Sequence, residues 1–179
     1  MLVFISNLLA AAVCLVVLLM LATVVVNLFI RVPYVPSKKR VIEKILEIAK
    51  LKKGEKVYDL GCGDGRFLIE AEKKAGICAI GYEAAPIPFL LAHFQKWINS
   101  SKIIIRMANF FKASLADADV IFCYLGPETM VRLAGKFKKE CRKGTRIYSH
   151  TFHIEGLEPV RVWTKDPEKK LPTIYYYEI

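Results

Sequence analysis

Residues 59–65 of the chain, Asp-Leu-Gly-Cys-Gly-Asp-Gly, decide the fold. They begin inside a short apolar run, residues 56–60, that is typical of a buried strand, and residues 66–75 behind them have helical periodicity. Glycines at alternate positions allow a tight turn, and they let a ligand approach the backbone because no Cβ lies in the way. The stretch therefore predicts a ligand-binding turn between a strand and a helix.

A carboxylate follows the next predicted strand. Residues 78–82 are apolar and Glu83 ends them, where an acid can accept hydrogen bonds from both hydroxyls of a ribose. The spacing of the turn is Gly-x-Gly-x-Gly, and Arg66 occupies the third-glycine position of the dinucleotide pattern. Asp59 and Asp64 would also repel a pyrophosphate. The turn therefore favours a ligand with a cationic part.

Outward from this turn, strands and helices alternate. Two prolines in residues 32–36 predict an extended linker, and Ser37 is the expected N-cap of a helix that runs to about Lys52 and is stopped by Gly54. Further helices are predicted at 66–75, 87–98 and 128–140, and strands at 56–60, 78–82, 102–107, 120–125, 145–149, 160–163 and 173–177. This alternation implies parallel strands with helices on both faces, and the last two strands predict an antiparallel edge hairpin. The expected fold class is α/β, a doubly wound, mostly parallel sheet of seven strands.

The first 30 residues carry no charged side chain, and the first cation is Arg31. A helix of this length rises about 45 Å, whereas about 20 residues cross the hydrocarbon of a bilayer. A cleaved signal peptide is the alternative, but no cation precedes the run and the run is too long. Lys38, Lys39 and Arg40 follow on the far side, which predicts that the rest of the chain faces the cytoplasm. We therefore expect a single-pass transmembrane helix in the cell membrane.

The expected organisation is a transmembrane helix at 1–30, a linker and pre-domain helix at 31–54, and the α/β domain at 55–179. The formal net charge is +10, from 27 Lys and Arg against 17 Asp and Glu. This positive charge is compatible with binding to anionic lipid, with binding to nucleic acid, or with a role in solubility alone. Attachment to a bilayer favours anionic lipid, because each juxtamembrane cation gains about 1 kcal/mol there. Five cysteines without a CxxC pair argue against a disulfide framework, and His150 and His153 lack the partners of a metal site.

Residues 59–65 followed by Gly81-Tyr82-Glu83 resemble the S-adenosyl-L-methionine site of class I methyltransferases, which have a Rossmann-like fold. A narrower resemblance covers nearly the whole chain. A membrane helix, Pro33-Tyr34-Val35-Pro36, a helix, the glycine turn and Tyr124-Leu125-Gly126-Pro127-Glu128 occur in the order found in membrane-anchored protein-lysine methyltransferases that modify ATP synthase and the adenine nucleotide translocase. The chain resembles a prokaryotic relative of these. It departs from them at residues 149–153, Ser-His-Thr-Phe-His, on the substrate side of the pocket.

The resemblance implies S-adenosyl-L-methionine as cofactor and a set of binding residues: Asp59, Gly61, Cys62, Gly63, Gly65, Glu83, Asn109 and Phe110. In this set the Asp59 carboxylate holds the methionine end, or only caps the turn, and Glu83 binds the ribose. The Asn109 amide can read the adenine with Phe110 packed on the ring, and an ordinary turn asparagine is the alternative. Arg66 pairs with the cofactor's carboxylate or lies in solvent.

Methyl transfer is an in-line displacement that depends mainly on alignment and desolvation. A lysine acceptor must first lose its proton, which a dry, cation-rich site promotes. The candidates are Tyr124 as a wall of the methyl channel, Tyr34 closing that channel from the linker, and Glu128 accepting or orienting the amine. The alternatives are core packing for Tyr124, an aromatic anchor at the bilayer surface for Tyr34, and a charge at a helix N-terminus for Glu128.

The predicted function is a membrane-anchored methyltransferase that N-methylates a lysine of a membrane protein. The alternatives are a methyltransferase of lipid headgroups or other small membrane amines, and a cofactor-binding scaffold without turnover. A nucleic-acid methyltransferase is favoured only by the charge. The turn after the fourth predicted strand is not of the Asn-Pro-Pro-Tyr type found in base-amine methyltransferases, and the chain lacks the Pro-Cys pair of cytosine C5 enzymes. We therefore expect no nucleic-acid partner.

Overall fold

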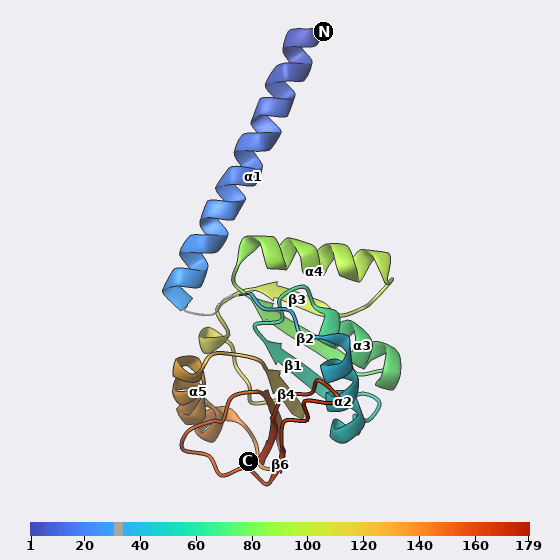
Figure 1. The fold of residues 1–179 in the computed structure, drawn as a ribbon, viewed down its shortest axis with the longest axis vertical. Helices are drawn as coiled ribbons and strands as arrows, with labels where there is room; N and C mark the ends of the chain where they lie inside the picture. Colours follow the sequence, from blue (N-terminus) through green and yellow to red (C-terminus); the bar gives the residue numbers. More distant parts are fainter. Residues whose placement is uncertain (31–33) are drawn as a thin grey trace.

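The computed structural model describes residues 1–30 and 34–179, and it has a long helix that projects from an α/β domain (Figure 1). The helices are α1 (Leu2–Ile30), α2 (Lys39–Ala49), α3 (Arg66–Ala75), α4 (Pro86–Ile98) and α5 (Pro127–Glu140), with a short 3-10 turn η1 (Phe110–Lys112). The strands are β1 (Lys56–Leu60), β2 (Cys78–Glu83), β3 (Ile104–Met107), β4 (Val120–Cys123), β5 (Arg146–His150), β6 (Arg161–Trp163) and β7 (Ile174–Glu178). Every predicted helix and strand is present. The predicted linker at 32–36 lies partly outside the described residues.

The seven strands form one sheet in the order β3-β2-β1-β4-β5-β7-β6. The first five pair in parallel, and β7 runs antiparallel between β5 and β6. The predicted fold class and the antiparallel final pair are confirmed. The strand order reverses between β1 and β4, so the crossover connections leave a crevice at the carboxyl ends of these two strands.

Side chains alternate across the sheet and build a core on each face. Val57 of β1 belongs to a core with α2, α3 and α4, whereas its neighbour Tyr58 belongs to the core that α5 covers. Ile45 of α2 is fully buried in the first of these cores. The predicted pre-domain helix therefore shares the core of the α/β domain.

The ends of α2 differ from the prediction. Ser37 was expected as the N-cap, but Lys38 occupies that position, and the Ser37 carbonyl accepts a hydrogen bond from Arg66 Nη1 at 3.3 Å instead. The helix ends at Ala49 rather than near Lys52, because Lys50 takes the left-handed conformation (φ 45°) that turns the chain toward β1. Gly54 lies beyond this point and does not stop the helix.

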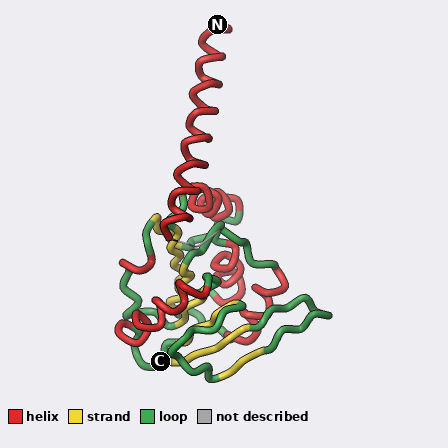
Figure 2. Tube along the Cα trace, turned by 60° about the vertical axis from the view of Figure 1, so that its left-hand side comes forward, coloured by secondary structure: helices red, strands yellow, loops and turns green. Residues whose placement is uncertain are grey.

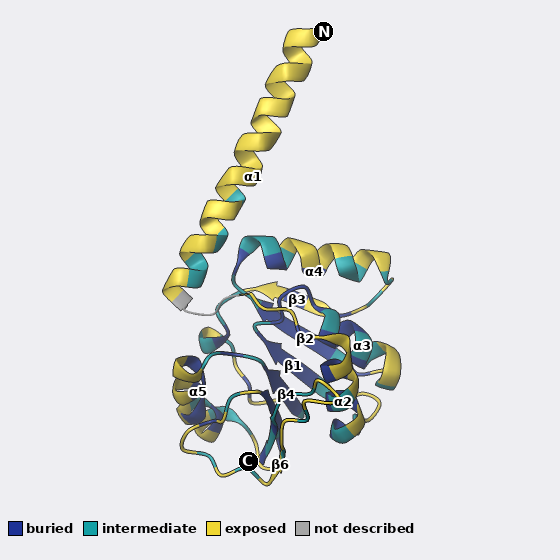
Figure 3. Ribbon diagram, in the orientation of Figure 1, coloured by how far each residue is buried: buried dark blue, intermediate teal, exposed yellow. Residues whose placement is uncertain are grey.

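α1 is exposed along most of its length and contacts the domain only near its carboxyl end (Figure 3). Thr23 Oγ1 accepts a hydrogen bond from the Ile87 amide of α4 at 3.1 Å. By length and composition, residues Leu2–Phe29 make a helix able to cross a membrane. A second view shows α4 seated at the base of the projecting helix (Figure 2).

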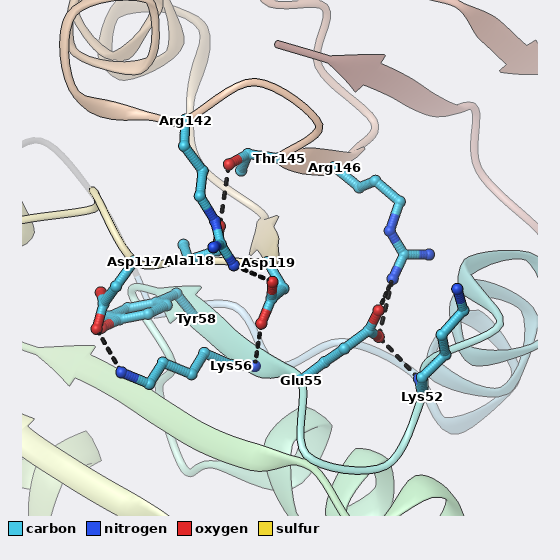
Figure 4. Close-up of polar contacts among 10 residues, drawn as sticks. All are labelled: Lys52, Glu55, Lys56, Tyr58, Asp117, Ala118, Asp119, Arg142, Thr145 and Arg146. Carbon is cyan, nitrogen blue, oxygen red and sulfur yellow. Dashed lines mark hydrogen bonds and ion pairs between the residues drawn. The ribbon is translucent and has the colours of Figure 1, made fainter.

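The amino ends of β1, β4 and β5 are joined by ion pairs and hydrogen bonds (Figure 4). Arg146 Nη2 donates to both carboxylate oxygens of Glu55 at 2.9 Å, and its Nη1 donates to the Ala49 carbonyl at the end of α2. Nearby, Arg142 pairs with Asp119 at the surface. These contacts lie at the amino ends of the strands, whereas the crevice lies at the carboxyl ends. We therefore assign them a role in the stability of the fold.

Replacing Arg146 with alanine should lower the free energy of unfolding by about 2 to 3 kcal/mol, because it leaves the largely buried Glu55 carboxylate without its ion-pair partner and the Ala49 carbonyl without its side-chain donor. Arg142→Ala is the matched control in the same network. That pair is more exposed, so its loss should cost less than about 1 kcal/mol. Urea unfolding in a mild detergent measures both. Equal losses for the two variants would contradict this ranking.

Candidate functional site

A cleft of about 730 Å³, its open mouth included, lies at the carboxyl ends of β1, β2 and β4. Six predicted cofactor residues line it: Asp59, Gly61, Cys62, Gly63, Glu83 and Phe110. Of the three predicted catalytic residues, Tyr34 and Tyr124 line the cleft, whereas Glu128 does not. α1 also contributes, since Val26 and Asn27 form part of the wall. No pattern in the sequence indicates this contribution.

The glycine turn needs its glycines for two reasons. Gly61 and Gly63 have φ values of +78° and +56°, in the left-handed region that favours glycine. A Cβ on Gly63 would also lie 2.7 Å from Cε2 of Tyr34, so the Tyr34 ring packs directly on the turn. Gly65 is the N-cap of α3, where a Cβ would lie 3.3 Å from Ile103, which gives this predicted cofactor residue a packing role.

Glu83 holds the turn in place. Its Oε2 accepts the Gly63 N–H at 2.9 Å and its Oε1 accepts the Ala85 N–H at 2.8 Å. Burial raises the pKa of this carboxyl, and the backbone donors oppose that shift. Gly81 lets β2 lie against the turn, because a Cβ there would come within 2.6 Å of Cys62 Sγ. Sequence reasoning used Gly81 only as part of a motif and missed this requirement.

Three carboxylates surround the turn. Burial, followed by the nearby charges of Glu83 and Asp64, raises the pKa of Asp59 well above its usual range. Asp64 is neutralised by Arg66, whose Nε lies 2.9 Å from both carboxylate oxygens. Among the described residues, neither Asp59 nor Glu83 forms an ion pair. The cleft therefore fits a ligand that carries positive charge, as the sulfonium and ammonium groups of S-adenosylmethionine do.

The sequence leaves two alternative roles open for each of Arg66 and Asn109, and the geometry of the site can be compared with them. The Arg66 guanidinium pairs with Asp64 and stays partly exposed to solvent, and a contact with the cofactor's carboxylate stays a prediction. Asn109 Oδ1 accepts the Phe111 N–H at 2.9 Å as the cap of η1, and Asn109 lines a separate surface hollow with Tyr58 and other residues. This is the ordinary turn role of asparagine. A contact between its amide and an adenine stays a prediction.

The predicted catalytic residues have different surroundings. Tyr34 packs on the glycine turn, where burial and the negative charge of Asp64 raise the pKa of its hydroxyl. Tyr34 also lines the cleft, and its role in closing a methyl channel stays a prediction. Glu128 is exposed in the first turn of α5, where a carboxylate interacts favourably with the helix dipole. A role for Glu128 at the acceptor amine stays a prediction.

Tyr124 stands between the cleft and a second cavity of about 890 Å³, its open mouth included. The second cavity is lined by Lys38, His150, Lys165 and Lys170, among others. The ring centroids of Tyr124 and His150 lie 3.8 Å apart. His150 is 5% exposed, and its Nδ1 has no hydrogen-bond partner among the described residues. The predicted strand 145–149 stops one residue before His150, and the approach of this imidazole to Tyr124 depends on the pairing of β4 with β5.

Burial lowers the pKa of His150 to about 4, so this imidazole is neutral in the folded protein at pH 7. In the unfolded chain it gains a proton below pH about 6.5. The stability that the neutral form provides is therefore present above pH 6.5 and is lost as the pH falls toward 4, by about 3 kcal/mol in all. Urea unfolding at a series of pH values should show this loss in the wild type and not in His150→Phe.

His93→Phe is the control for that series, because the His93 side chain is exposed. It should keep the pH dependence of the wild type. An unchanged pH dependence in His150→Phe would show that the buried imidazole is not the titrating group.

Comparisons with known proteins agree with this geometry. Residues 59–161 match the family of the ANTKMT methyltransferase domain. A protein-lysine N-methyltransferase of Saccharolobus islandicus strain REY15A is 37% identical over 151 residues, which cover 83% of this chain and 94% of that protein. The adenine nucleotide translocase lysine N-methyltransferase of Mus musculus is 31% identical over 159 residues, which cover 83% of this chain and 69% of that protein.

A solved structure also resembles this one closely. It is an RNA methyltransferase from Salinibacter ruber in complex with S-adenosyl-L-homocysteine, with a TM-score of 0.75 and 29% identity. The similarity covers 81% of this chain and 94% of that chain. S-adenosyl-L-homocysteine is what remains of S-adenosylmethionine after methyl transfer.

Proposed function

Because the chain belongs to the ANTKMT methyltransferase family, whose cofactor is S-adenosylmethionine, we propose that it N-methylates a lysine side chain of a membrane protein while α1 anchors it in the cell membrane. The observation that carries this proposal is the contribution of α1 to the cofactor cleft. The helix that is long and apolar enough to span a bilayer has Val26 and Asn27, near its carboxyl end, in the cleft wall. A cleft built this way lies beside the membrane surface, within reach of a lysine at that surface.

The orientation follows from the cations after α1. Lys38, Lys39 and Arg40 favour the cytoplasmic side, where an anionic leaflet attracts them. We therefore propose a cytoplasmic domain formed by residues 55–179 with α2 in its core, and α1 as the membrane-spanning helix. The Mus musculus relative is named for the adenine nucleotide translocase and a Homo sapiens relative for a component of ATP synthase, both of them membrane proteins.

The residues of the cleft have different roles in methyl transfer. When bound, S-adenosylmethionine supplies a methyl group activated by its sulfonium. The Asp59 carboxyl lines the cleft beside the cationic methionine part, whose positive charge would lower the raised pKa of this group, and Glu83 accepts hydrogen bonds from the ribose. Tyr124, at the boundary of the two cavities, aligns the acceptor with the cofactor and keeps water out, which supplies most of what an in-line displacement requires.

The second cavity suits the acceptor amine. Lys38, Lys165 and Lys170 carry positive charge around it, and nearby cations lower the pKa of a lysine ammonium. The acceptor therefore releases its proton to water at the rim and reaches Tyr124 as a neutral nucleophile. The same charges favour an acceptor lysine that lies next to acidic residues of its own protein.

Incubation of the full chain with native membranes and S-adenosylmethionine labelled in its methyl group tests the proposal. Label on a membrane-protein band, released as methyl-lysine on hydrolysis, is the expected result. Label in the lipid extract or on RNA would identify a different acceptor. Label on none of these fractions, with a cofactor-competent protein, would favour a scaffold without turnover.

A further inference from the structure

α4 turns its large apolar side chains outward. Leu90, Leu91, Phe94, Trp97 and Ile98 form what we call the α4 face, and each is between 41% and 76% exposed. Their spacing puts them on about one third of the helix circumference. On the inward face Pro88 and Ala92 are buried, and Phe89 packs partly against the core. An exposed stripe of this size is unusual on a soluble domain and marks an interaction surface.

α4 lies across the end of the domain from which α1 projects (Figures 1 and 2). The two helices are joined where the Ile87 amide donates to Thr23 Oγ1. Residues 2–22, which precede this contact, rise about 32 Å as a helix. The hydrocarbon of a bilayer is about 30 Å thick. A bilayer spanned by α1 therefore has its near boundary at the level of α4.

We propose that α4 is a second membrane-binding element, which lies in the plane of the bilayer surface with the α4 face among the lipid headgroups and upper acyl chains. This inference rests on the proposed membrane anchoring by α1. Trp97 has the side chain that proteins favour at this depth. Lys96 is the charged residue of α4, and the helix has no carboxylate, which suits an anionic leaflet.

The second contact has a consequence for the active site. A single spanning helix by itself does not fix which side of the domain faces the bilayer surface. α1 and α4 together define a plane, so the domain keeps one orientation on the surface. The cleft wall at Val26 and Asn27 then stays at the lipid boundary.

The chain contains an intrinsic fluorescent probe of the contact between α4 and lipid. It has two tryptophans: Trp97 is in the α4 face, and Trp163 is in β6 at the end of the domain remote from α1 (Figure 1). The full chain with Trp163→Phe is reconstituted in vesicles of phosphatidylcholine and phosphatidylglycerol brominated near the headgroup end of the acyl chains. An interfacial helix buries its apolar face about 5–10 Å deep, so emission from Trp97 should fall at least about two-fold relative to unbrominated lipid. The reciprocal variant, Trp97→Phe, should show no quenching of Trp163.

A charge in the stripe gives the matched comparison. Phe94→Glu, made in the Trp163→Phe chain, should lose most of the quenching, whereas Val131→Glu on the exposed side of α5 should keep it. Flotation of the vesicles reports anchoring separately. Protein that floats with Trp97 unquenched overturns the role of α4 and leaves the anchor intact. Protein that does not float overturns both. Trp97 emission that depends on the protein-to-lipid ratio and not on bromine shows a second copy on the α4 face, which also overturns the proposal.

Discussion

Replacing Glu83 with alanine is expected to weaken S-adenosylmethionine binding about 100- to 1,000-fold, because hydrogen bonds to a charged carboxylate contribute about 1.5 to 3 kcal/mol each. The carboxylate accepts the Gly63 and Ala85 amides, and it is the predicted partner of the ribose hydroxyls. Its removal therefore loosens the glycine turn and deletes a ligand contact in one step. Isothermal titration calorimetry on the full chain in detergent measures the affinity.

Two further variants separate these effects. Glu83→Gln keeps the length of the side chain and one acceptor oxygen, so its affinity should lie between those of the wild type and Glu83→Ala. Glu43→Ala, on the exposed side of α2, should bind as the wild type does. Wild-type affinity in a folded Glu83→Ala protein would remove Glu83 from the cofactor site.

Gly63→Ala is expected to have an effect of similar size on activity. The added Cβ would sit 2.7 Å from the Tyr34 ring, and the backbone at φ +56° is strained for alanine by about 1 to 2 kcal/mol. The turn or Tyr34 must move, and either shift disturbs the cleft at the position where alignment matters. A displacement of about 1 Å can cost about 100-fold in rate. Single-turnover methylation with saturating cofactor measures this loss.

Gly144→Ala controls for backbone strain without a collision. Gly144 has φ +85°, and a Cβ there meets no heavy atom within 4 Å. It should lose stability and keep its rate. The double variant Gly63→Ala with Tyr34→Ala removes the collision, so its rate should be higher than the product of the two single losses predicts. Independent, multiplicative losses would show that the ring and the turn do not interact.

Much of the fold could be predicted because the signals are local. Residues 56–60 and 66–75 were expected as a strand and a helix, and the structure has them with the same bounds as β1 and α3. The ends of α2 were predicted less well. The helical periodicity continues past Ala49, but the left-handed Lys50 is imposed by the need to deliver β1 into the sheet. Asn109 shows the same limit, since nothing in its neighbours along the chain distinguishes a cap from a ligand contact.

The amino-acid sequence by itself determined the glycine turn, the acid at the end of β2, the apolar helix and the α/β alternation, because each depends on residues close together in the chain. Only the tertiary structure decided that α1 reaches the cleft wall, that Tyr124 and His150 meet between two cavities, and that α4 turns its apolar face outward beside α1. These features join segments far apart in sequence. Helical periodicity marks which residues share a face, but the packing of the whole chain determines which face is covered.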